Sequence, residues 1–375
     1  MRARQLDFRA AEQKLAANGY IELNKVQFIR ILEECIEERD LGALRRRIAD
    51  LKQEILAPRG SQSSLLTSDR NSDTAPFRQD ILESDLDQIT DSQTVERAHY
   101  YVSRLKAGAE RIRTGKINDI NLLRWKEYDD VLTDSLWIVD RRDNAGVHRA
   151  DYWGNFIPQI PRQMMLRYTK KGEWVLDTFV GSGTTLIECR RLGRNGIGIE
   201  LNPAVADSAR KLVNQEPNEG GVTTDIVEGD STTLDFTALL QQRGVGTVQL
   251  LIMHPPYHDI IRFSDHPRDL STAGSVDEFL AGFGQVVEKS YPILDDGRYL
   301  AVVIGDKYAE GEWIPLGFYT MQEVLRRGYT LKSVIVKNFD ETRAKRQQQE
   351  LWRYRALVGG FYVFKHEYIL LFRKD

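Results

Sequence analysis

From about residue 150 to the C-terminus, short apolar runs of strand length alternate with segments long enough to form helices. Continuous apolar runs of this length are typical of strands that are buried on both faces. We therefore predict an α/β fold, with a doubly wound, Rossmann-like sheet of seven strands covered by helices on both sides. The seven runs are 174–176, 196–199, 224–227, 250–253, 299–304, 331–336 and 368–372.

The first 130 residues show a different pattern, and we predict a helical region over 1–130 and a second domain over 131–375. A stretch near 59–77, rich in Ser, Asp and Thr, predicts a linker or loop within the first region. Between Leu41 and Ile55, five apolar residues recur at helical spacing with basic residues between them. This helix either packs against the domain beside it or pairs with a second chain, in a homodimer or with another protein.

Composition excludes several classes of protein. The net charge is −3 and the pI is about 6.2, so any contact with nucleic acid must come from a local basic patch. No apolar run approaches the roughly 18 residues of a membrane span, and the N-terminus lacks the apolar segment of a secretory signal. With only Cys35 and Cys189, neither a disulfide framework nor a four-ligand zinc site is expected. We predict a cytoplasmic protein without a metal site.

A glycine-rich turn, Asp177-Thr-Phe-Val-Gly181-Ser-Gly183-Thr-Thr, follows the first apolar run and opens a helix. Its glycines allow a tight turn and a close approach of the backbone to a ligand. A dinucleotide fingerprint would need Gly or Ala where Leu186 stands, and a phosphate-binding loop would need a Lys that is absent. The remaining candidate is S-adenosylmethionine, whose methionine end and ribose need no pyrophosphate cradle.

Two carboxylates follow the next two strands in the order that this cofactor requires. Glu200 ends the second run and can accept hydrogen bonds from both ribose hydroxyls. Asp230 follows the third run and can reach an adenine amino group. Together with the glycine-rich turn, they favour the cofactor over a simple helix cap or turn.

The fourth apolar run leads directly into His254-Pro255-Pro256-Tyr257. Two prolines hold the chain extended and rigid after the strand. The Tyr257 ring offers a flat face for stacking a flipped base. His254 and the Pro255 carbonyl can accept the two hydrogens of an exocyclic amine, which would aim its nitrogen at a methyl donor.

These motifs resemble those of the S-adenosylmethionine-dependent DNA amino-methyltransferases, which modify cytosine-N4 or adenine-N6. The resemblance covers roughly residues 134–375, including 155–161, which is similar to the segment that closes over the methionine end, and the last strand. It implies that His254, Pro255, Pro256 and Tyr257 are catalytic. The cofactor-binding residues that follow from the motifs and the resemblance are Phe156, Pro158, Asp177, Phe179, Gly181, Ser182, Gly183, Thr184, Thr185, Glu200, Asn202 and Asp230.

His254 departs from this family, which usually has Asp, Asn or Ser at that position. The absence of Asp favours cytosine-N4 over adenine-N6 without deciding between them. If His254 accepts a hydrogen from the target amine, an ordinary imidazole pKa predicts loss of activity near pH 6 to 7. Methylation of cytosine-C5 is excluded because neither cysteine follows a proline on a loop after a strand, and zinc-dependent deamination because there is no Cys-x-x-Cys.

Contacts with DNA are expected from two loops after the catalytic motif. One follows Tyr257 and contains Arg262, and the other spans 332–355, with seven basic residues against three acidic ones. Basic residues interleaved with Trp and Tyr beside such a site are typical of phosphate contacts. The candidate DNA-binding residues are Arg262, Arg343, Lys345, Arg346, Arg353 and Arg355.

The leading hypothesis is a methyltransferase that acts on double-stranded DNA with a flipped target base, in DNA modification or a restriction-modification system. RNA or a protein glutamine amide are alternative substrates, because their enzymes also use Pro-Pro-Tyr loops. A third hypothesis is a non-catalytic subunit that binds S-adenosylmethionine and DNA. The N-terminal region would supply further recognition or dock to a partner.

Overall fold

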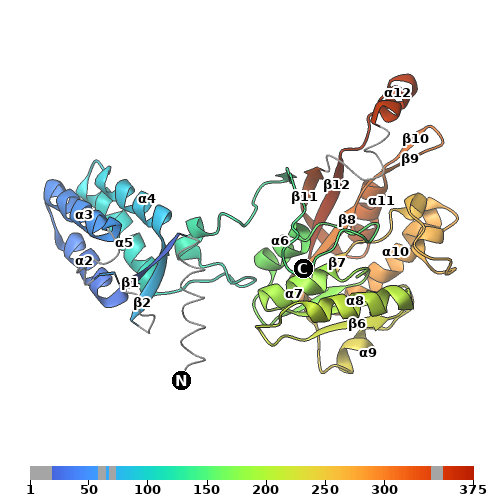
Figure 1. Cartoon of the computed structure of the whole chain (residues 1–375), viewed down its shortest axis with the longest axis horizontal. Coiled ribbons are helices and arrows are strands. Elements are labelled where there is room, and N and C mark those ends of the chain that lie inside the picture. The colour runs from blue at the N-terminus through green and yellow to red at the C-terminus, as the bar shows by residue number, and fades with distance from the viewer. Residues whose placement is uncertain (1–18, 58–64, 67–72, 339–348) are drawn as a thin grey trace. The chain divides into compact units, whose positions relative to one another are not determined.

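The computed structural model describes residues 19–57, 65–66, 73–338 and 349–375 (Figure 1). Contacts between Cα atoms divide the chain into two compact units. The N-terminal unit takes the residues up to 115 together with 120–130, and the C-terminal unit takes 116–119 together with 131–375. Each unit has its own hydrophobic core.

The N-terminal unit combines helices with a two-stranded antiparallel sheet, in which Tyr20 pairs with Arg78. The sheet was not expected, because its second strand falls at the end of the segment predicted as a loop. Leu65, in the same segment, is fully buried, and its carbonyl accepts the amide hydrogen of Asn24 at 2.8 Å. The elements are β1 (Tyr20–Asn24), α2 (Lys25–Glu37), α3 (Leu41–Leu56), β2 (Thr74–Arg78), α4 (Gln79–Thr90), α5 (Val95–Glu110) and the 3-10 helix η1 (Leu122–Glu127).

The apolar stripe between Leu41 and Ile55 lies on α3 and faces the core of its own unit. Leu44, Ile48 and Leu51 are at most 3% exposed and share a cluster with residues of α4 and α5. The structure therefore supports the interpretation in which this helix packs against its own chain, and the helices it contacts belong to the same unit. The stripe is not available to a second chain.

The C-terminal unit is built on an eight-stranded sheet with the order β3-β11-β12-β8-β7-β4-β5-β6. All seven predicted runs are strands of this sheet, so the predicted α/β fold is confirmed. The eighth strand, β3, is a short addition that pairs in parallel with β11. The strands are β3 (Leu136–Trp137), β4 (Trp174–Asp177), β5 (Asn195–Glu200), β6 (Thr224–Glu228), β7 (Val248–Met253), β8 (Leu294–Ile304), β11 (Tyr329–Asn338) and β12 (His366–Lys374).

The last strand, β12, runs antiparallel to both of its neighbours, β8 and β11, whereas β4 to β8 are mutually parallel. Its N-terminal end therefore lies at the same edge of the sheet as the C-terminal ends of the parallel strands. The chain passes from β4 to β5 on one side, while β7 lies on the other side of β4. This reversal of strand order makes the edge between β4 and β7 the expected place for a ligand.

Helices cover both faces of the sheet, as the continuous apolar runs required. In β7, Leu251 and Met253 pack on one face with α9 and α10, while Leu250 and Ile252 pack on the other face with α6. All four are fully buried, and each contributes about 1.5–3 kcal/mol to folding. The helices are α6 (Gln159–Tyr168), α7 (Thr184–Leu192), α8 (Pro203–Gln215), α9 (Phe236–Gln241), α10 (Val276–Ser290), α11 (Leu316–Arg326) and α12 (Gln349–Gly359).

The remaining elements are short and lie after β7 and β8. Figure 1 shows α12 beside the hairpin of β9 and β10, and the rings of Tyr308 and Phe361 stack there with centroids 4.0 Å apart. No helix within the described ranges is long and apolar enough to cross a membrane. The short elements are the 3-10 helices η2 (His258–Ile260) and η3 (Leu270–Thr272) and the strands β9 (Lys307–Ala309) and β10 (Glu312–Ile314).

Candidate active site

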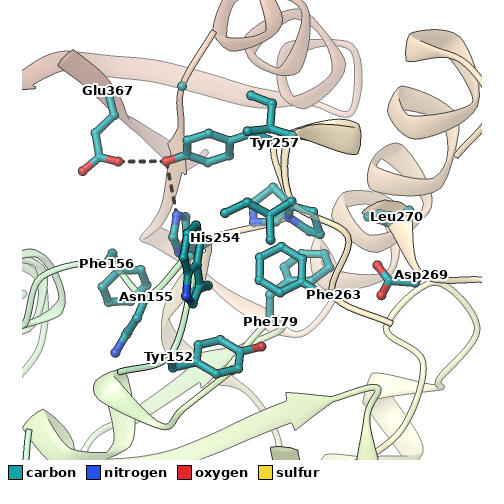
Figure 2. A pocket seen from close by; sticks show the side chains of 18 of the residues that line it. Tyr152, Asn155, Phe156, Phe179, His254, Tyr257, Phe263, Asp269, Leu270 and Glu367 are labelled. Carbon is teal, nitrogen blue, oxygen red and sulfur yellow. Dashed lines mark hydrogen bonds between the residues drawn. The ribbon is translucent and has the colours of Figure 1, made fainter. Parts of the chain in front are cut away.

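A cavity of about 1110 Å³ opens at the C-terminal ends of the parallel strands, around the point where the strand order reverses (Figure 2). Its volume lies slightly above the usual range for small-molecule sites, roughly 300–1,000 Å³, so it has room for more than one small ligand. The loops after β4, β5, β6, β7 and β8 line it, together with the segment 150–157 and the site ends of β11 and β12. The glycine-rich turn and the Pro-Pro-Tyr loop thus open onto one space.

The two glycines of the turn have different roles. Gly181 lines the cavity with φ of 52°, and a Cβ there would lie 3.2 Å from the Tyr152 ring. Gly183 has φ of 88° and lies behind the cavity, where a Cβ would come within 2.7 Å of Val213 on α8. Gly181 therefore leaves space for a ligand, whereas Gly183 allows α7 and α8 to pack closely.

Glu200, at the end of β5, joins the two loops on the cofactor side of the cavity. Its Oε2 accepts the amide hydrogen of Gly181 at 3.1 Å and its Oε1 that of Asn202 at 2.9 Å. Burial raises the pKa of this carboxyl, while the two backbone hydrogen bonds oppose the increase. Each oxygen accepts one bond here and has further acceptor capacity for a ligand's hydroxyl groups.

Asp230 also lines the cavity, after β6, and its side chain is held by local bonds. Its Oδ1 accepts the amide hydrogen of Thr232 at 2.8 Å, and its Oδ2 lies 3.3 Å from the Arg268 guanidinium. These contacts hold the carboxylate in place where it lines the cavity. This arrangement places an acceptor one strand further along the sheet from Glu200, as the motif order predicted.

Asp177 supports the turn from behind. It is fully buried, its Oδ1 accepts the amide hydrogen of Phe179 at 3.0 Å, and its Oδ2 accepts the hydroxyl hydrogen of Thr185. Burial raises its pKa to about 6, although these two hydrogen bonds act in the opposite direction. Asn202 similarly caps α8 by accepting the amide hydrogen of Ala204 at 3.0 Å.

The structure therefore separates the predicted cofactor-binding residues into two groups. Those that line the cavity are Phe156, Phe179, Gly181, Ser182, Thr184, Glu200 and Asp230. Those that stand behind it and shape its wall are Pro158, Asp177, Gly183, Thr185 and Asn202.

The segment 150–157 forms the wall opposite the strand ends. Asn155 Oδ1 accepts the hydroxyl hydrogen of Thr184 at 2.6 Å, which ties this segment to the start of α7. The Tyr152 ring stacks on Phe263, with centroids 6.2 Å apart. These contacts close one side of the cavity with aromatic rings.

His254, the first residue after β7, is partly buried and lines the cavity with all three residues that follow it. Its ring centroid lies 4.9 Å from that of Phe156. Burial lowers the pKa of His254 to about 4, and the nearby Lys337 lowers it further, whereas Glu367 acts in the opposite direction. The loss of activity expected near pH 6 to 7 must therefore be corrected, because the imidazole remains neutral throughout that range.

Tyr257 is held at both its ring and its hydroxyl. A Cβ on Gly305, after β8, would lie 2.8 Å from the tyrosine ring, so only glycine allows the ring to pack there. The hydroxyl donates to Glu367 Oε2 at 2.8 Å, and burial together with this carboxylate raises the pKa of Tyr257 well above its usual value. Tyr257 is therefore a rigid, neutral part of the cavity wall (Figure 2).

Sequence reasoning missed Glu367 and Lys337, both of which line the cavity. Lys337 was counted in the basic segment expected to contact phosphates, yet it is only 4% exposed and donates to Glu367 Oε1 at 2.8 Å. The two residues face one another across the antiparallel pair β11–β12. The one available signal was that each residue stands next to the long apolar part of its strand, Lys337 after 334–336 and Glu367 before 368–372.

The candidate DNA-binding residues that the structure describes are exposed on the surface. The Arg262 side chain is 66% exposed and pairs with Asp265 at 2.9 Å. Arg353 and Arg355 are exposed on α12, and the Arg355 guanidinium lies 5.2 Å from the centre of the Trp352 ring. Arg343, Lys345 and Arg346 lie outside the described residues.

Cys189 is fully buried on α7, and burial raises its pKa well above that of a free thiol. It therefore fits the predicted role of a small apolar residue rather than a nucleophile. Within the described part of the chain, no three His, Cys, Asp or Glu side chains are grouped as metal ligands.

Residues 88–211 match a family model described as DNA methylase. The matched range includes the glycine-rich turn and Glu200, and it ends before the Pro-Pro-Tyr loop. The Type II methyltransferase M.MjaII of Methanocaldococcus jannaschii is 43% identical over 58 residues, 16% of this chain and 11% of that protein. M.Cfr9I of Citrobacter freundii is 38% identical over 85 residues, 22% and 27% of the two chains. M2.DpnII of Streptococcus pneumoniae is 32% identical over 114 residues, which are 28% of this chain and 42% of that protein.

The resemblance to the DNA amino-methyltransferases is confirmed. The matched regions span less than half the length of each of these three relatives. Among solved structures, TrmN from Thermus thermophilus aligns with a TM-score of 0.38 and 14% identity, over 59% of this chain and 49% of that chain. The fold assigned to this chain rests on its own strand order.

S-adenosylmethionine is the methyl donor indicated by the resemblance to DNA methylases, and the residues around the cavity fit it. Glu200 presents carboxylate oxygens at the strand end that a ribose requires, and Asp230 presents an acceptor on the next strand. At Gly181, a Cβ would fill the space beside Tyr152 that the backbone leaves open. No pyrophosphate-binding lysine accompanies the turn.

Proposed function

We propose that this chain transfers a methyl group from S-adenosylmethionine to an exocyclic amino nitrogen of a base in DNA. The observation that carries the proposal is the single cavity that both the glycine-rich turn and the loop His254–Tyr257 line. A donor and an acceptor bound there would be neighbours, as direct transfer requires. The resemblance to DNA methylases supports DNA as the substrate.

The residues on the cofactor side bind and orient. S-adenosylmethionine, when bound, supplies a methyl group made reactive by an adjacent positively charged sulfur. Glu200 would accept the ribose hydroxyls, and Asp230 the adenine amino group. The segment around Phe156 would close over the methionine end, where its ring already contacts His254.

On the substrate side, neutral acceptors would orient the target amine. A pKa of about 4 keeps the His254 imidazole uncharged at physiological pH, so a lone pair is available for one amine hydrogen. The Pro255 carbonyl would accept the other hydrogen. These two bonds would direct the nitrogen lone pair toward the methyl group, and positioning of this kind needs no covalent intermediate.

A flipped base would stack on the aromatic wall, with Tyr257 fixed by Gly305 and Glu367. The base remains open between cytosine and adenine, with cytosine-N4 favoured because His254 replaces the more usual Asp. The N-terminal unit and the basic residues on α12 would supply further contacts with double-stranded DNA.

Incubating the protein with methyl-labelled S-adenosylmethionine and DNA, RNA or protein tests the proposed function directly. We expect label in DNA, and nucleoside mass spectrometry should then show N4-methylcytosine or N6-methyladenine. If label appears only in RNA or in a protein amide, the proposed DNA substrate is wrong. Binding of both ligands without any transfer would indicate a non-catalytic recognition subunit.

Replacing both Arg353 and Arg355 by Ala should weaken DNA binding equally for all sequences. Each phosphate contact contributes about 0.9 to the slope of log K against log salt concentration, so we expect the slope to become shallower by roughly 2. Fluorescence anisotropy over a salt series measures it.

Arg326→Ala is the matched control for this pair. Its side chain is also exposed, at the end of α11 just before β11 begins, and hence at the edge of the sheet opposite the cavity. An unchanged slope in the Arg353→Ala/Arg355→Ala variant would make α12 a solvated surface rather than a DNA contact.

A further inference from the structure

Four polar side chains, two of them in the catalytic loop, form a connected chain of hydrogen bonds, and Figure 2 shows the part that joins His254, Tyr257 and Glu367. Lys337 donates to Glu367 Oε1 at 2.8 Å, and Tyr257 donates to Glu367 Oε2 at 2.8 Å. His254 Nε2 lies 3.2 Å from the Tyr257 hydroxyl oxygen. Tyr257 and Glu367 are 110 residues apart, so only the fold brings them together.

The network depends on the antiparallel direction of β12. Lys337 lies near the C-terminal end of β11 and faces Glu367, which lies near the N-terminal end of β12. Both are buried, at 4% and 8% exposure. Removing such a pair from water is costly, so the pair must be compensated by its mutual attraction and by further hydrogen bonds, such as the one from Tyr257.

The direction of each hydrogen bond follows from the donors available. An ammonium can only donate and an ionised carboxylate can only accept, so Glu367 receives hydrogens from both Lys337 and Tyr257. Although burial raises the pKa of Glu367, the charge of Lys337 and the hydrogen bonds hold it below its usual value. The carboxylate is therefore ionised.

The tyrosine has one hydroxyl hydrogen, and Glu367 receives it. Its oxygen can then only accept from His254, so Nε2 of the imidazole must carry the hydrogen. A neutral imidazole has one N–H, which leaves the lone pair on Nδ1. Among the described residues, none forms a hydrogen bond with this Nδ1, and the His254 side chain lines the cavity.

We propose that Glu367 and Lys337 are positioning residues that hold His254 in the Nε2–H tautomer, so that Nδ1 presents its lone pair to the amine of the target base. The proposal rests on the proposed function for the identity of that amine. Without the relay through Tyr257, the imidazole could present an N–H instead, which would repel an amine hydrogen. An amide or carboxylate oxygen can accept a hydrogen bond in any state, whereas an imidazole nitrogen accepts only in the right tautomer. The hydrogen bonds through Tyr257 fix that tautomer and so allow histidine to act as the acceptor at this position.

The alternative is that the Lys337–Glu367 pair only braces β11 against β12. A brace would affect stability when removed and leave the histidine tautomer unchanged. The two roles are therefore separated by a readout of the imidazole nitrogens rather than by activity alone.

Long-range ¹H–¹⁵N spectra of histidine-labelled protein at pH 7 supply that readout, because protonated and unprotonated ring nitrogens resonate far apart. The chain has six histidines, and the signal lost in His254→Asn assigns the one in question. We expect wild type to show a protonated Nε2 and an unprotonated Nδ1. In Tyr257→Phe and Glu367→Gln, we expect a mixture of both tautomers.

Tyr368→Phe is the matched control. It removes a hydroxyl that donates to Asp306 at 3.2 Å from the next residue of β12, on the opposite face of the sheet. We expect its His254 signals to be unchanged, because this hydroxyl has no bond to the chain of Lys337, Glu367, Tyr257 and His254. In Tyr257→Phe, kcat should fall about fivefold or more, as expected for a lost hydrogen bond, while the Kd for S-adenosylmethionine stays constant.

A wild-type Nδ1–H tautomer, or an unchanged His254 signal in Tyr257→Phe, would overturn the proposal. If Glu367→Gln does not fold, Tyr257→Phe alone decides the question. The spectra need no substrate, so a protein with the expected tautomer that methylates no nucleic acid would overturn the proposed function and leave the tautomer assignment intact.

Discussion

Replacing Glu200 by Ala is expected to weaken S-adenosylmethionine binding by about 100-fold or more. The carboxylate is the only group that both joins the loops after β4 and β5 and faces the cavity with free acceptor capacity among the residues described. Hydrogen bonds to a charged acceptor contribute about 1.5–3 kcal/mol each, so losing two ribose bonds reaches that factor. Isothermal titration calorimetry measures the change.

Glu228→Ala is the matched control, because Glu228 faces Glu200 across β5 and β6 and is exposed outside the cavity. Gly181→Val provides a second disruption, since its φ of 52° disfavours a branched side chain and a Cβ would lie 3.2 Å from Tyr152. Both cavity variants should remain folded by circular dichroism. An unaltered Kd in folded Glu200→Ala and Gly181→Val would refute the assignment of the cofactor to this side of the cavity.

Replacing His254 by Ala is expected to lower kcat by about 100-fold, the usual effect of deleting one preorganised polar group at a reacting centre. His254→Asn keeps an acceptor and should retain part of the activity. Because the pKa of His254 is lowered to about 4, wild-type kcat at saturating substrates should stay flat from pH 5.5 to 8. An acid limb near pH 6 to 7 that disappears in His254→Asn would show instead that the imidazole titrates normally.

The same pKa shift makes a prediction for stability. Unfolded His254 would titrate near 6.5 and the folded residue near 4, so the unfolded state binds the extra proton between these values. Above pH 6.5 the contribution of His254 to stability is fully present. As the pH falls from 6.5 to 4, up to about 3 kcal/mol is lost. Urea unfolding at pH 7 and pH 5 measures how much the free energy of unfolding falls between the two pH values. We expect a larger fall for wild type than for His254→Asn.

His266→Ala is the histidine control for both measurements. This residue lies exposed on the loop after β7, outside the cavity, where its Nδ1 accepts the amide hydrogen of Arg268 at 3.2 Å. We expect wild-type kcat and a wild-type dependence of stability on pH. A comparable loss in His266→Ala would mean that the His254 effects arise from general damage to this loop.

Local sequence was sufficient for the parts of this protein that depend on neighbours along the chain. Apolar runs predicted all seven main strands, and the signal was clearest for β7, in which five of the six residues are buried. Glycines 181 and 183 marked a turn that only positive φ permits. Since parallel strands end at one edge, the order of the motifs also predicted that Gly181, Glu200 and His254 would meet at a common cavity.

Where pairing partners are distant in sequence, the prediction was incomplete. The N-terminal region was predicted to be helical, yet β1 pairs with β2 across 49 intervening residues, and local sequence patterns do not show which distant strands pair. The stripe on α3 had two equivalent interpretations until its burial in the core was known. Similarly, the sequence did not distinguish Lys337 from the other basic residues of the segment 332–355.

The sequence by itself therefore determined the sheet, and it located the glycine-rich turn and the Pro-Pro-Tyr loop that both open onto the cavity. Only the tertiary structure decided the electrostatic state of that loop. Antiparallel insertion of β12 between β8 and β11 places Glu367 against Tyr257 and Lys337, and the resulting burial lowers the pKa of His254. The state of an imidazole depends on the groups that surround it in space, and these come from strands more than 80 residues further along the chain.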